Sequence, residues 1–469
     1  MAPSAAMEVI QFFVGVDFGS RPHVDSSQVA TALVMAGDGT AILQSKHSHP
    51  ASLNWFKLAL LHQNEQPRGE VFKAASRAWA HMAAKDMTCI FLRALLRRPL
   101  EELQSSRPLV DKAQMQFNVV FTFPASWGHD DCKRMKEAVQ AIDIQELVPG
   151  SQISTSYLSE QEAAFLSLLV HPIVANFQEL VVVCDVGGWT LDTASYVMCP
   201  FVNGLHSVRE CGKARSVAHG AFSLHDGVDR LLRDGIEAIT RNRNWLDNAP
   251  ERPRIAARLQ GIVKRYKSGA TGRVRFHIQF DSKARDIFIS RDRLDELFNM
   301  HAEQIIASIN AALQNATIAY EHQYGVEVLA IPIHIALTGR HETAAQRFGQ
   351  YYPHGGCFAV AHGAAIHSAI DYLRNHNRAN VLVERTSPAR FFVKCRDGSD
   401  VTLAMQGQPI QTHHTTCDVG RAGVVIHDRR SLVVHSAMDN MESKYVTFTW
   451  VVSDPVLQNR ELSLKFCPD

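Results

Sequence analysis

The chain has 469 residues, of which 46% are hydrophobic and 20% charged, and its formal net charge is +1 at pH 7. This composition predicts a soluble globular protein of two or three structural units, and the balanced charge argues against a nucleic-acid or membrane-surface partner attracted by bulk electrostatics. The nine cysteines form no C-x-x-C pair. Because no apolar run could span a bilayer and the first residues lack the basic start of a secretory signal, we expect a cytoplasmic protein with reduced thiols.

The first part of the chain predicts alternating strands and helices. "FFVGVDFGS" indicates a strand that ends in an acid and a glycine turn, and a second strand, "QVATALVM", follows the loop "RPHVDSS". A helical region is expected from about Asn54 to Leu103. Next come a strand, "FNVVFTF", and an amphipathic helix that the Pro and Ser of "PASWGHDD" would open. "ISTSYLSEQEAAFLSLLV" predicts a strand and a helix, and "LVVVCDVGGWTLDTASYVM" a strand, a tight turn and a second strand.

The predicted secondary structure changes twice in the second part of the chain. Residues 222–325 are predicted to be largely helical, interrupted by a hairpin of "GRVRFHIQF" and "DIFIS". "HIALTGRHETAAQRFGQ" indicates a strand, a glycine turn and a helix, and "GGCFAVAHGAAIHSAIDYL" a glycine turn and another helix. From about Asn380, short alternating runs predict an all-β module. The pattern as a whole predicts an α/β fold followed by this module.

Several of these stretches resemble one family in their order along the chain. The strand–acid–glycine turns at Asp17 and Asp185, with a third strand–glycine–helix element at Gly339, resemble the duplicated phosphate-binding hairpins shared by actin, sugar kinases and Hsp70 chaperones. "FTFPASW", "SEQEAAFLSLL", "VKRYKSG" and "FAVAHGAAI" are similar to Hsp70 elements. "NWFKLALL" is most like the divergent, fungal-type branch of Hsp70-like proteins with actin-like ATPase domains.

The resemblance implies two structural parts. Residues 10–380 would form the two-lobed, actin/Hsp70-like nucleotide-binding fold of duplicated RNase H-like domains, with one lobe from about 10–180 and 358–380 and the other from about 181–357. Residues 381–469 resemble a truncated Hsp70 β-sandwich, including the turn "QGQPIQT", without a helical lid. The usual acidic linker between the parts is replaced by "NVLVERTSP".

The resemblance also implies an ATP and Mg²⁺ site between the lobes. Transfer of a phosphoryl group to water needs positioning and neutralised charge, which backbone amides, a lysine and a few carboxylates beside a hydrated Mg²⁺ can supply. Lys57 would be the catalytic lysine, Glu160 the glutamate beside the metal and the water, and Asp192 the second acid of its hairpin. Asp17 and Asp185 would hold the hydrated metal. The other residues implied to contact the nucleotide are Gly19, Ser20, Gly187, Gly188, Trp189, Thr190, Lys264, Arg265, Gly339 and Arg340.

Each of these residues also has a simpler interpretation. The aspartates could be turn acids at strand ends, Lys57 an ordinary lysine on a helix surface, and Glu160 an acid favoured by a helix dipole. Lys264 and Arg265 lie in a basic stretch that suits a solvated helix. His341 and His362, near the expected base pocket, are predicted to be structural or exposed residues.

The sequence departs from the family where the nucleotide would bind. Trp189 replaces the third glycine of the second phosphate turn, where glycine adopts positive φ freely and leaves room for phosphate. The first hairpin carries the longer stretch "SRPHVDSS", Thr338 replaces the first glycine of the adenosine turn, and Gly261 stands where a glutamate is usual.

Three hypotheses therefore stay open. The first is a weak, Hsp70-like ATPase with a particular protein client. The second is a fold reused as a non-ATPase enzyme or small-molecule-binding protein in a biosynthetic pathway, with Trp189, Arg340 and His362 lining the cleft between the lobes. The third is a catalytically silent scaffold.

Overall fold

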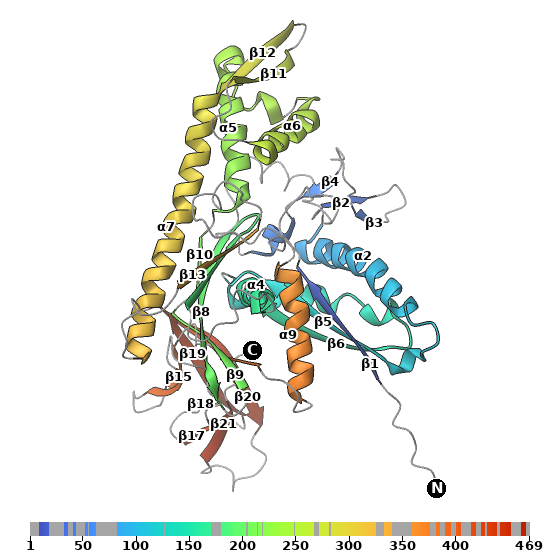
Figure 1. Cartoon of the computed structure of the whole chain (residues 1–469), viewed down its shortest axis with the longest axis vertical. Helices are drawn as coiled ribbons and strands as arrows, with labels where there is room; N and C mark the ends of the chain where they lie inside the picture. The colour runs from blue at the N-terminus through green and yellow to red at the C-terminus, as the bar shows by residue number, and fades with distance from the viewer. Residues whose placement is uncertain are drawn as a thin grey trace.

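The computed structural model describes the greater part of the chain between residues 9 and 465. The described residues are 9–17, 32–35, 41–43, 52–54, 56–61, 82–125, 127–169, 180–202, 205–212, 214–217, 219–247, 249–266, 272–280, 283–324, 333–339, 359–375, 381–384, 390–394, 400–404, 414–418, 424–426, 429–438, 441–451 and 461–465. They form a mixed α/β structure with parallel and mixed sheets (Figure 1). No helix among them is long and apolar enough to cross a membrane.

The first sheet is parallel and has the order β1-β5-β6. Its strands are β1 (Ile10–Val16), β5 (Met115–Phe123) and β6 (Gln152–Ser159). On one face lie α4 (Glu160–Leu169) and α9 (Ala359–Asn375), which Figure 1 shows side by side. Two glycines allow this close packing, because a Cβ on Gly15 would lie 1.8 Å from the Ala361 carbonyl oxygen and one on Gly363 would lie 1.5 Å from that of Ala163.

The other face of this sheet packs on α2 (Ala84–Ser105) and α3 (His129–Gln140). Of the helical region expected from about Asn54 to Leu103, the described residues show a 3-10 helix, η1 (Phe56–Leu60), and α2, while residues 62–81 lie outside them. The expected opening of α3 by Pro and Ser is wrong. Pro124 instead begins a turn that the Trp127 amide closes, and Gly128 precedes the helix, donating to the Asp131 carboxylate at 3.1 Å.

The second strand expected from the sequence lies in a sheet of its own. β2 (Ala32–Met35) pairs on both edges, with β3 (Ala41–Leu43) and β4 (Ser52–Asn54). Among the described residues, β1 pairs in parallel with β5 and not with β2. The expected antiparallel hairpin around Asp17 is therefore not formed by the residues that are described.

The second sheet is mixed and has the order β13-β7-β8-β9-β14, with β10 beside β8. Its strands are β7 (Leu180–Val186), β8 (Leu191–Val202), β9 (Leu205–Glu210), β10 (Arg215–Val217), β13 (Ile333–Gly339) and β14 (Val381–Glu384). Every residue of β7 is buried, as its apolar run predicts. The stretch "NVLVERTSP" supplies β14, which pairs in parallel with β9, so this sheet continues past residue 380.

A mainly helical region lies beyond one end of the second sheet (Figure 1). It contains α5 (Ala221–Thr240), η5 (Trp245–Asp247), α6 (Arg252–Arg265), the hairpin of β11 (Arg273–Phe280) and β12 (Lys283–Ser290), and α7 (Arg291–Tyr324). The helices and the hairpin match the expectation for residues 222–325. Two short 3-10 segments, η2 (Lys112–Gln114) and η3 (Ile144–Glu146), lie near the first sheet.

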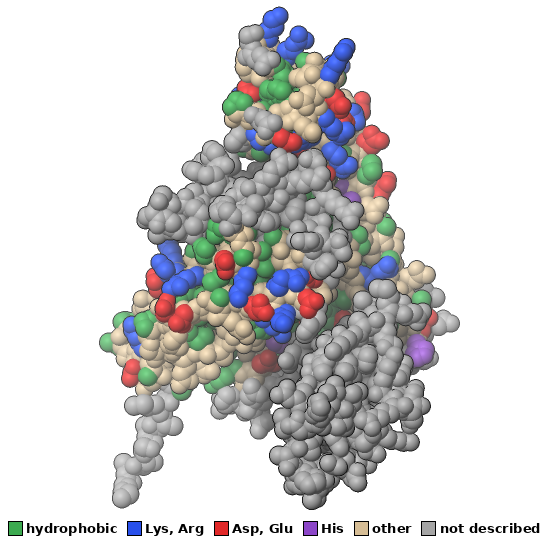
Figure 2. Space-filling model, turned by 180° about the vertical axis from the view of Figure 1, so that it is seen from behind, with side chains coloured by type: hydrophobic (Ala, Val, Ile, Leu, Met, Phe, Trp, Pro, Cys, Tyr) green, Lys and Arg blue, Asp and Glu red, His purple; other side chains and the backbone are tan. Residues whose placement is uncertain are grey.

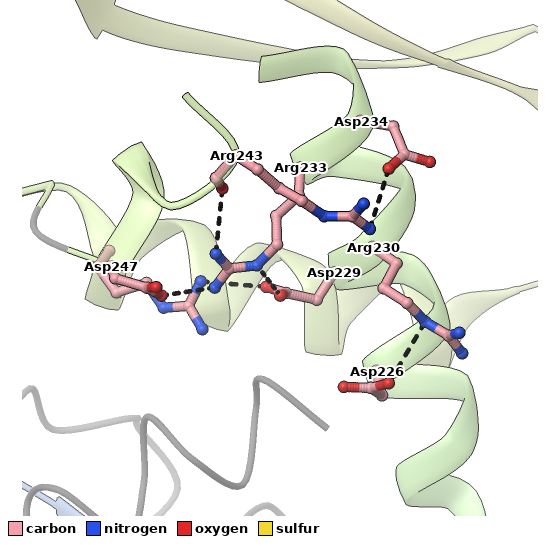
Figure 3. A network of polar contacts seen from close by, with 8 residues as sticks. Asp226, Asp229, Arg230, Arg233, Asp234, Arg243 and Asp247 are labelled. Carbon is pink, nitrogen blue, oxygen red and sulfur yellow. Dashed lines mark hydrogen bonds and ion pairs between the residues drawn. The ribbon is translucent and has the colours of Figure 1, made fainter. Parts of the chain in front are cut away.

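Buried ion pairs hold α5, η5 and α6 together, and we call them the Arg233 network (Figure 3). The Arg233 side chain donates from Nε to Asp229 at 2.6 Å and from a terminal nitrogen to Asp247 at 2.7 Å. Arg252 donates to the second oxygen of Asp229 at 3.1 Å. Arg233 also donates to the Arg243 carbonyl oxygen. The network thus fixes the start of α6 against α5.

The C-terminal stretch contributes strands to two sheets. β15 (Arg390–Lys394), β16 (Asp400–Ala404), β18 (Val424–Ile426), β19 (Arg429–Met438) and β20 (Met441–Val451) pair antiparallel, and β17 (His414–Asp418) pairs with β21 (Glu461–Lys465). The helix expected after Gly339 lies outside the described residues, as do Gly19, Ser20, Arg340 and His341.

Candidate functional site

The turn between β7 and β8 carries the acids that the sequence singles out. Asp185 and Asp192 are directly opposite each other in the antiparallel register, and the Gly187 amide donates to the Thr190 carbonyl oxygen at 2.9 Å to close the turn. Both side chains are buried, Asp192 completely. Two carboxylates therefore lie at the buried root of one tight turn.

The backbone of this turn packs against the start of α5. The Ala221, Phe222 and Gly220 amides donate to the carbonyl oxygens of Gly187, Gly188 and Trp189, at 3.0, 2.7 and 2.7 Å. Gly220 has to be glycine here, since a Cβ would lie 2.6 Å from the Gly187 oxygen.

These hydrogen bonds also fix the direction of the next amides. In a trans peptide the carbonyl and the following N–H point to opposite sides, and the described residues contain no cis bond. The N–H groups of Gly188, Trp189 and Thr190 therefore point away from α5. Successive N–H groups aimed to one side are the arrangement that backbone anion sites use.

Trp189 packs inward without backbone strain. Its ring makes an edge contact with Phe222, with centroids 5.3 Å apart, and packs as a half-buried side chain against the core cluster of the first sheet. Arg241 is the non-glycine residue with positive φ among those described, so Trp189 has none. The strain expected from replacing a glycine at this position is therefore absent.

Lys57 and Glu160 form a buried ion pair with 3.0 Å between Nζ and Oε1. Lys57 lies in η1 next to the core residue Leu58 and is 2% exposed, so the simpler interpretation as a surface lysine on a helix is wrong. Glu160 begins α4, where the Ser159 hydroxyl accepts a hydrogen bond from the Glu162 amide in the manner of an N-cap. The Trp127 ring lies under the ammonium group, with Nζ 5.5 Å from its centroid.

The charges of this region act on one another. Burial raises the pKa of Glu160; Lys57 opposes this rise, and Asp17, Asp185 and Asp192 add to it. Asp17, at the end of β1, is therefore near enough to act on Glu160. We call Lys57, Glu160, Asp17, Asp185 and Asp192 the acidic cluster.

Asp192 is the most deeply buried acid of the cluster. Burial raises its pKa from 3.8 to about 7, while Ser216, Thr190 and Lys57 lower it and Asp185 raises it. The Thr190 hydroxyl donates to Oδ2 of Asp192. Ser216 lies opposite Asp192 in the register of β8 and β10, but its hydroxyl does not reach the geometry of a hydrogen bond.

Thr338, on the neighbouring strand β13, contacts one acid of the cluster. It lies opposite Asp185 in the register of β13 and β7, and its hydroxyl donates to Oδ1 of Asp185 at 2.8 Å. Gly339 ends β13 opposite Val186. The threonine that departs from the family pattern therefore orients one of the acids.

The acidic cluster carries more negative than positive charge when its carboxyl groups are ionised. It combines one lysine with four carboxylates, so a divalent cation would offset charge that protons must otherwise neutralise. Within the described part of the chain, no three His, Cys, Asp or Glu side chains are grouped so that they could ligate a metal. Mg²⁺ keeps most of its water when it binds proteins. Asp17 and Asp185 would hold such an ion through water.

The remaining predicted residues lie elsewhere or outside the described residues. Lys264 and Arg265 end α6, and Gly261 lies inside it. His362 in α9 contacts the Ser167 hydroxyl of α4, with 3.0 Å between Nδ1 and Oγ. It therefore pairs with a helix behind the first sheet rather than with Trp189.

Two residues of the site were not singled out from the sequence. The Trp127 ring lies against the Lys57 ammonium group, and Gly220 lets the turn between β7 and β8 pack against α5. Trp127 follows the strand end in "FTFPASW", but its partner Lys57 is 70 positions away, so no local signal joins them. A scan of protein-family models found none that matches this chain, and a search of curated proteins found no relative.

Proposed function

We propose that this chain is an Hsp70-like protein that binds ATP and hydrolyses it weakly, in the service of a particular protein client or pathway in the cytosol. The observation that carries the proposal is the convergence of Lys57, Glu160, Asp185 and Asp192. These residues come from η1, α4, β7 and β8, yet they form one buried group. They are also the residues that the resemblance assigns to phosphoryl transfer.

The two-lobed fold and the C-terminal module are part of the same proposal. The two sheets, each backed by helices, with α9 returning to the first sheet, support duplicated domains around a central site. The antiparallel strands from β15 onward support a β module.

The chain's own groups would act in distinct ways. The amides of Gly188, Trp189 and Thr190 offer donors for phosphate oxygens on the side of the turn away from α5. Lys57, held between Glu160 and the Trp127 ring, supplies a fixed positive charge. A raised pKa makes the ionised Glu160 carboxylate a stronger base, which would accept the proton that an attacking water gives up. Bound Mg²⁺ would neutralise the phosphate charge.

Calorimetric titration of the full chain with Mg-ATP tests this function. We expect heat of binding and a raised melting temperature, both lost in Asp185→Asn, which keeps the shape of the side chain and removes its charge. Asp130→Asn, exposed on α3, is the matched control and should behave as the unchanged protein. Absence of any response to millimolar Mg-ATP in the unchanged protein would contradict the proposal.

A silent scaffold is the second candidate, and one observation favours it. Trp189 places a large side chain beside Phe222 and the core cluster, at a position where the family that the chain resembles has a glycine. Trp189→Gly separates the candidates. A working site binds Mg-ATP in the unchanged protein, whereas a site closed by the indole gains binding only in the variant. The small-molecule hypothesis loses His362 as a lining residue, because that side chain pairs with Ser167.

A further inference from the structure

Positive charge is concentrated in one stretch of this nearly neutral chain. Residues 241–293 contain fourteen Lys and Arg and five Asp and Glu, a net charge of +9, whereas the whole chain carries +1. The rest of the chain is therefore acidic overall. In the fold, this stretch forms η5, α6 and the hairpin of β11 and β12 at one end of the molecule (Figure 1).

The hairpin has one buried and one exposed face. Alternate residues of β11, including Phe276, Ile278 and Phe280, pack into a core with α5 and α6. Arg273 and Arg275 stand on the opposite face and are exposed. Phe288 lies directly across from Arg275 in β12 and is 52% exposed, although it is a large apolar side chain.

Two arginines of α6 lie beside the hairpin, at the edge of β11 and next to its buried face. Arg254 and Arg258, one turn apart and both exposed, reach β11: Arg254 donates to the His277 carbonyl oxygen at 3.0 Å, and the Arg258 guanidinium lies 5.4 Å from the centroid of Phe276. Figure 2 shows Lys and Arg side chains gathered at this end. We call Arg273, Arg275 and Phe288 on the exposed face, with Arg254 at the strand edge, the arginine patch.

A partner would lie across this patch rather than add a strand to the edge of β11. That edge is used by α6, because Arg254 bonds the His277 carbonyl oxygen and the Gln279 amide donates to Glu251. Within the described residues, Arg273 forms no ion pair, so its charge is available to a ligand.

The acids within the patch favour a peptide over a nucleic acid. Asp286 accepts from Arg275 at 2.9 Å, and Glu251 lies 3.8 Å from Arg254. A continuous phosphate backbone would meet these carboxylates, whereas a peptide can place a neutral residue there. Arg273 and Arg275 are two residues apart on one strand face, about 6.6 Å, which is also the spacing of alternate side chains in an extended peptide. Phe288 offers an apolar contact.

We propose that the arginine patch is a docking surface for an extended, acidic protein segment that carries an apolar side chain. Its carboxylates pair with the arginines, and its apolar side chain packs on Phe288. This binding is independent of the acidic cluster and of ATP.

Fluorescence anisotropy with a labelled peptide of alternating Glu and Leu and one central Phe tests the proposal on the full chain. We expect binding that weakens with added salt. Arg273→Glu with Arg275→Glu should weaken it at least about tenfold, because attraction becomes repulsion. Phe288→Ser should weaken it about threefold. The matched control is Arg97→Glu with Arg107→Glu. These two arginines are also exposed, one in α2 and one just after it, and their exchange should change the binding affinity less than about twofold.

Three results would overturn the proposal. They are absence of peptide binding, equal binding of a peptide with Gln in place of Glu, and tighter binding of an oligothymidylate of the same charge, which would indicate a nucleic-acid surface. Since all four substituted arginines and Phe288 are exposed, urea unfolding is expected to show the variants folded. A patch variant that unfolds early is replaced by Arg273→Gln alone, judged by the same binding measurement.

Discussion

Two groups of buried charged side chains in this protein differ in how their charges balance. In the Arg233 network, two arginines meet two aspartates, and its three ion pairs measure 2.6, 2.7 and 3.1 Å (Figure 3). The acidic cluster sets four carboxylates against Lys57, and burial, with the neighbouring carboxylates, raises the pKa values of Glu160 and Asp192. Both groups are removed from water, so the difference lies in charge and not in burial.

This difference separates structure from ligand binding. A balanced, fully hydrogen-bonded network needs no further partner, and removing one member leaves buried charge behind. An unbalanced cluster must take up protons or bind a cation to become stable. Substitutions should therefore have opposite effects in the two groups: loss of an acid should destabilise the first and stabilise the second.

The largest change in stability is expected when Arg233 is removed from the Arg233 network. Arg233→Met should lower the free energy of unfolding by about 3–5 kcal/mol, because Asp229 and Asp247 lose their shared partner while remaining buried. Urea unfolding measures it. Arg230→Ala is the matched control. Arg230 pairs with Asp226 one turn earlier on the same helix, but its side chain is 58% exposed, so the change should stay within about 0.5 kcal/mol.

A smaller loss of stability is expected when Lys57, the cation of the acidic cluster, is replaced. Lys57→Met should lower the free energy of unfolding by about 2–3 kcal/mol at pH 8, below the cost in the Arg233 network because Glu160 can take up a proton. Without Lys57 the pKa of Glu160 rises further, and the folded state holds that proton more tightly than the unfolded state does. The loss should therefore shrink toward pH 6, as urea unfolding at both pH values will show. A loss independent of pH would contradict this account.

How far the sequence predicts these features depends on whether the signal is local. The turn from Asp185 to Asp192 was predictable, because a buried strand, two glycines and a returning strand lie within a dozen residues. The hairpin of β11 and β12 followed from its alternating pattern in the same way. Both signals are read from neighbouring residues.

Features that depend on distant contacts could not be predicted. The burial of Lys57 depends on contacts with Trp127 and Glu160, which follow it by 70 and 103 residues. Thr338 looked like a departure from the family pattern, but its register with Asp185 gives it a hydrogen bond that a glycine could not make. Trp189 looked strained because its φ was inferred from a family glycine, and its own backbone has no positive φ.

The smallest expected effect has the opposite sign and gives the sharpest test of the comparison. Asp192→Asn should raise the free energy of unfolding by about 1–2 kcal/mol at pH 8 in the absence of nucleotide. The reason is linkage. The pKa of Asp192 is 3.8 before folding and about 7 after it, so folding takes up a proton between these values and the native protein loses stability as pH rises from about 4 to about 7. Asparagine removes that loss.

The gain from Asp192→Asn should therefore vanish below pH 4 and be complete above pH 7, whereas Asp229→Asn in the Arg233 network should destabilise the protein at every pH in this range. Urea unfolding of the two variants at pH 4, 6 and 8 compares them directly. The same measurement is then repeated with Mg-ATP present. Asp192→Asn should no longer be more stable than the unchanged protein, because Mg-ATP binds to the unchanged cluster more tightly than to the variant and so stabilises it more. If Asp192→Asn were destabilising at pH 8 by as much as Asp229→Asn, the acidic cluster would be a balanced structural network like its counterpart.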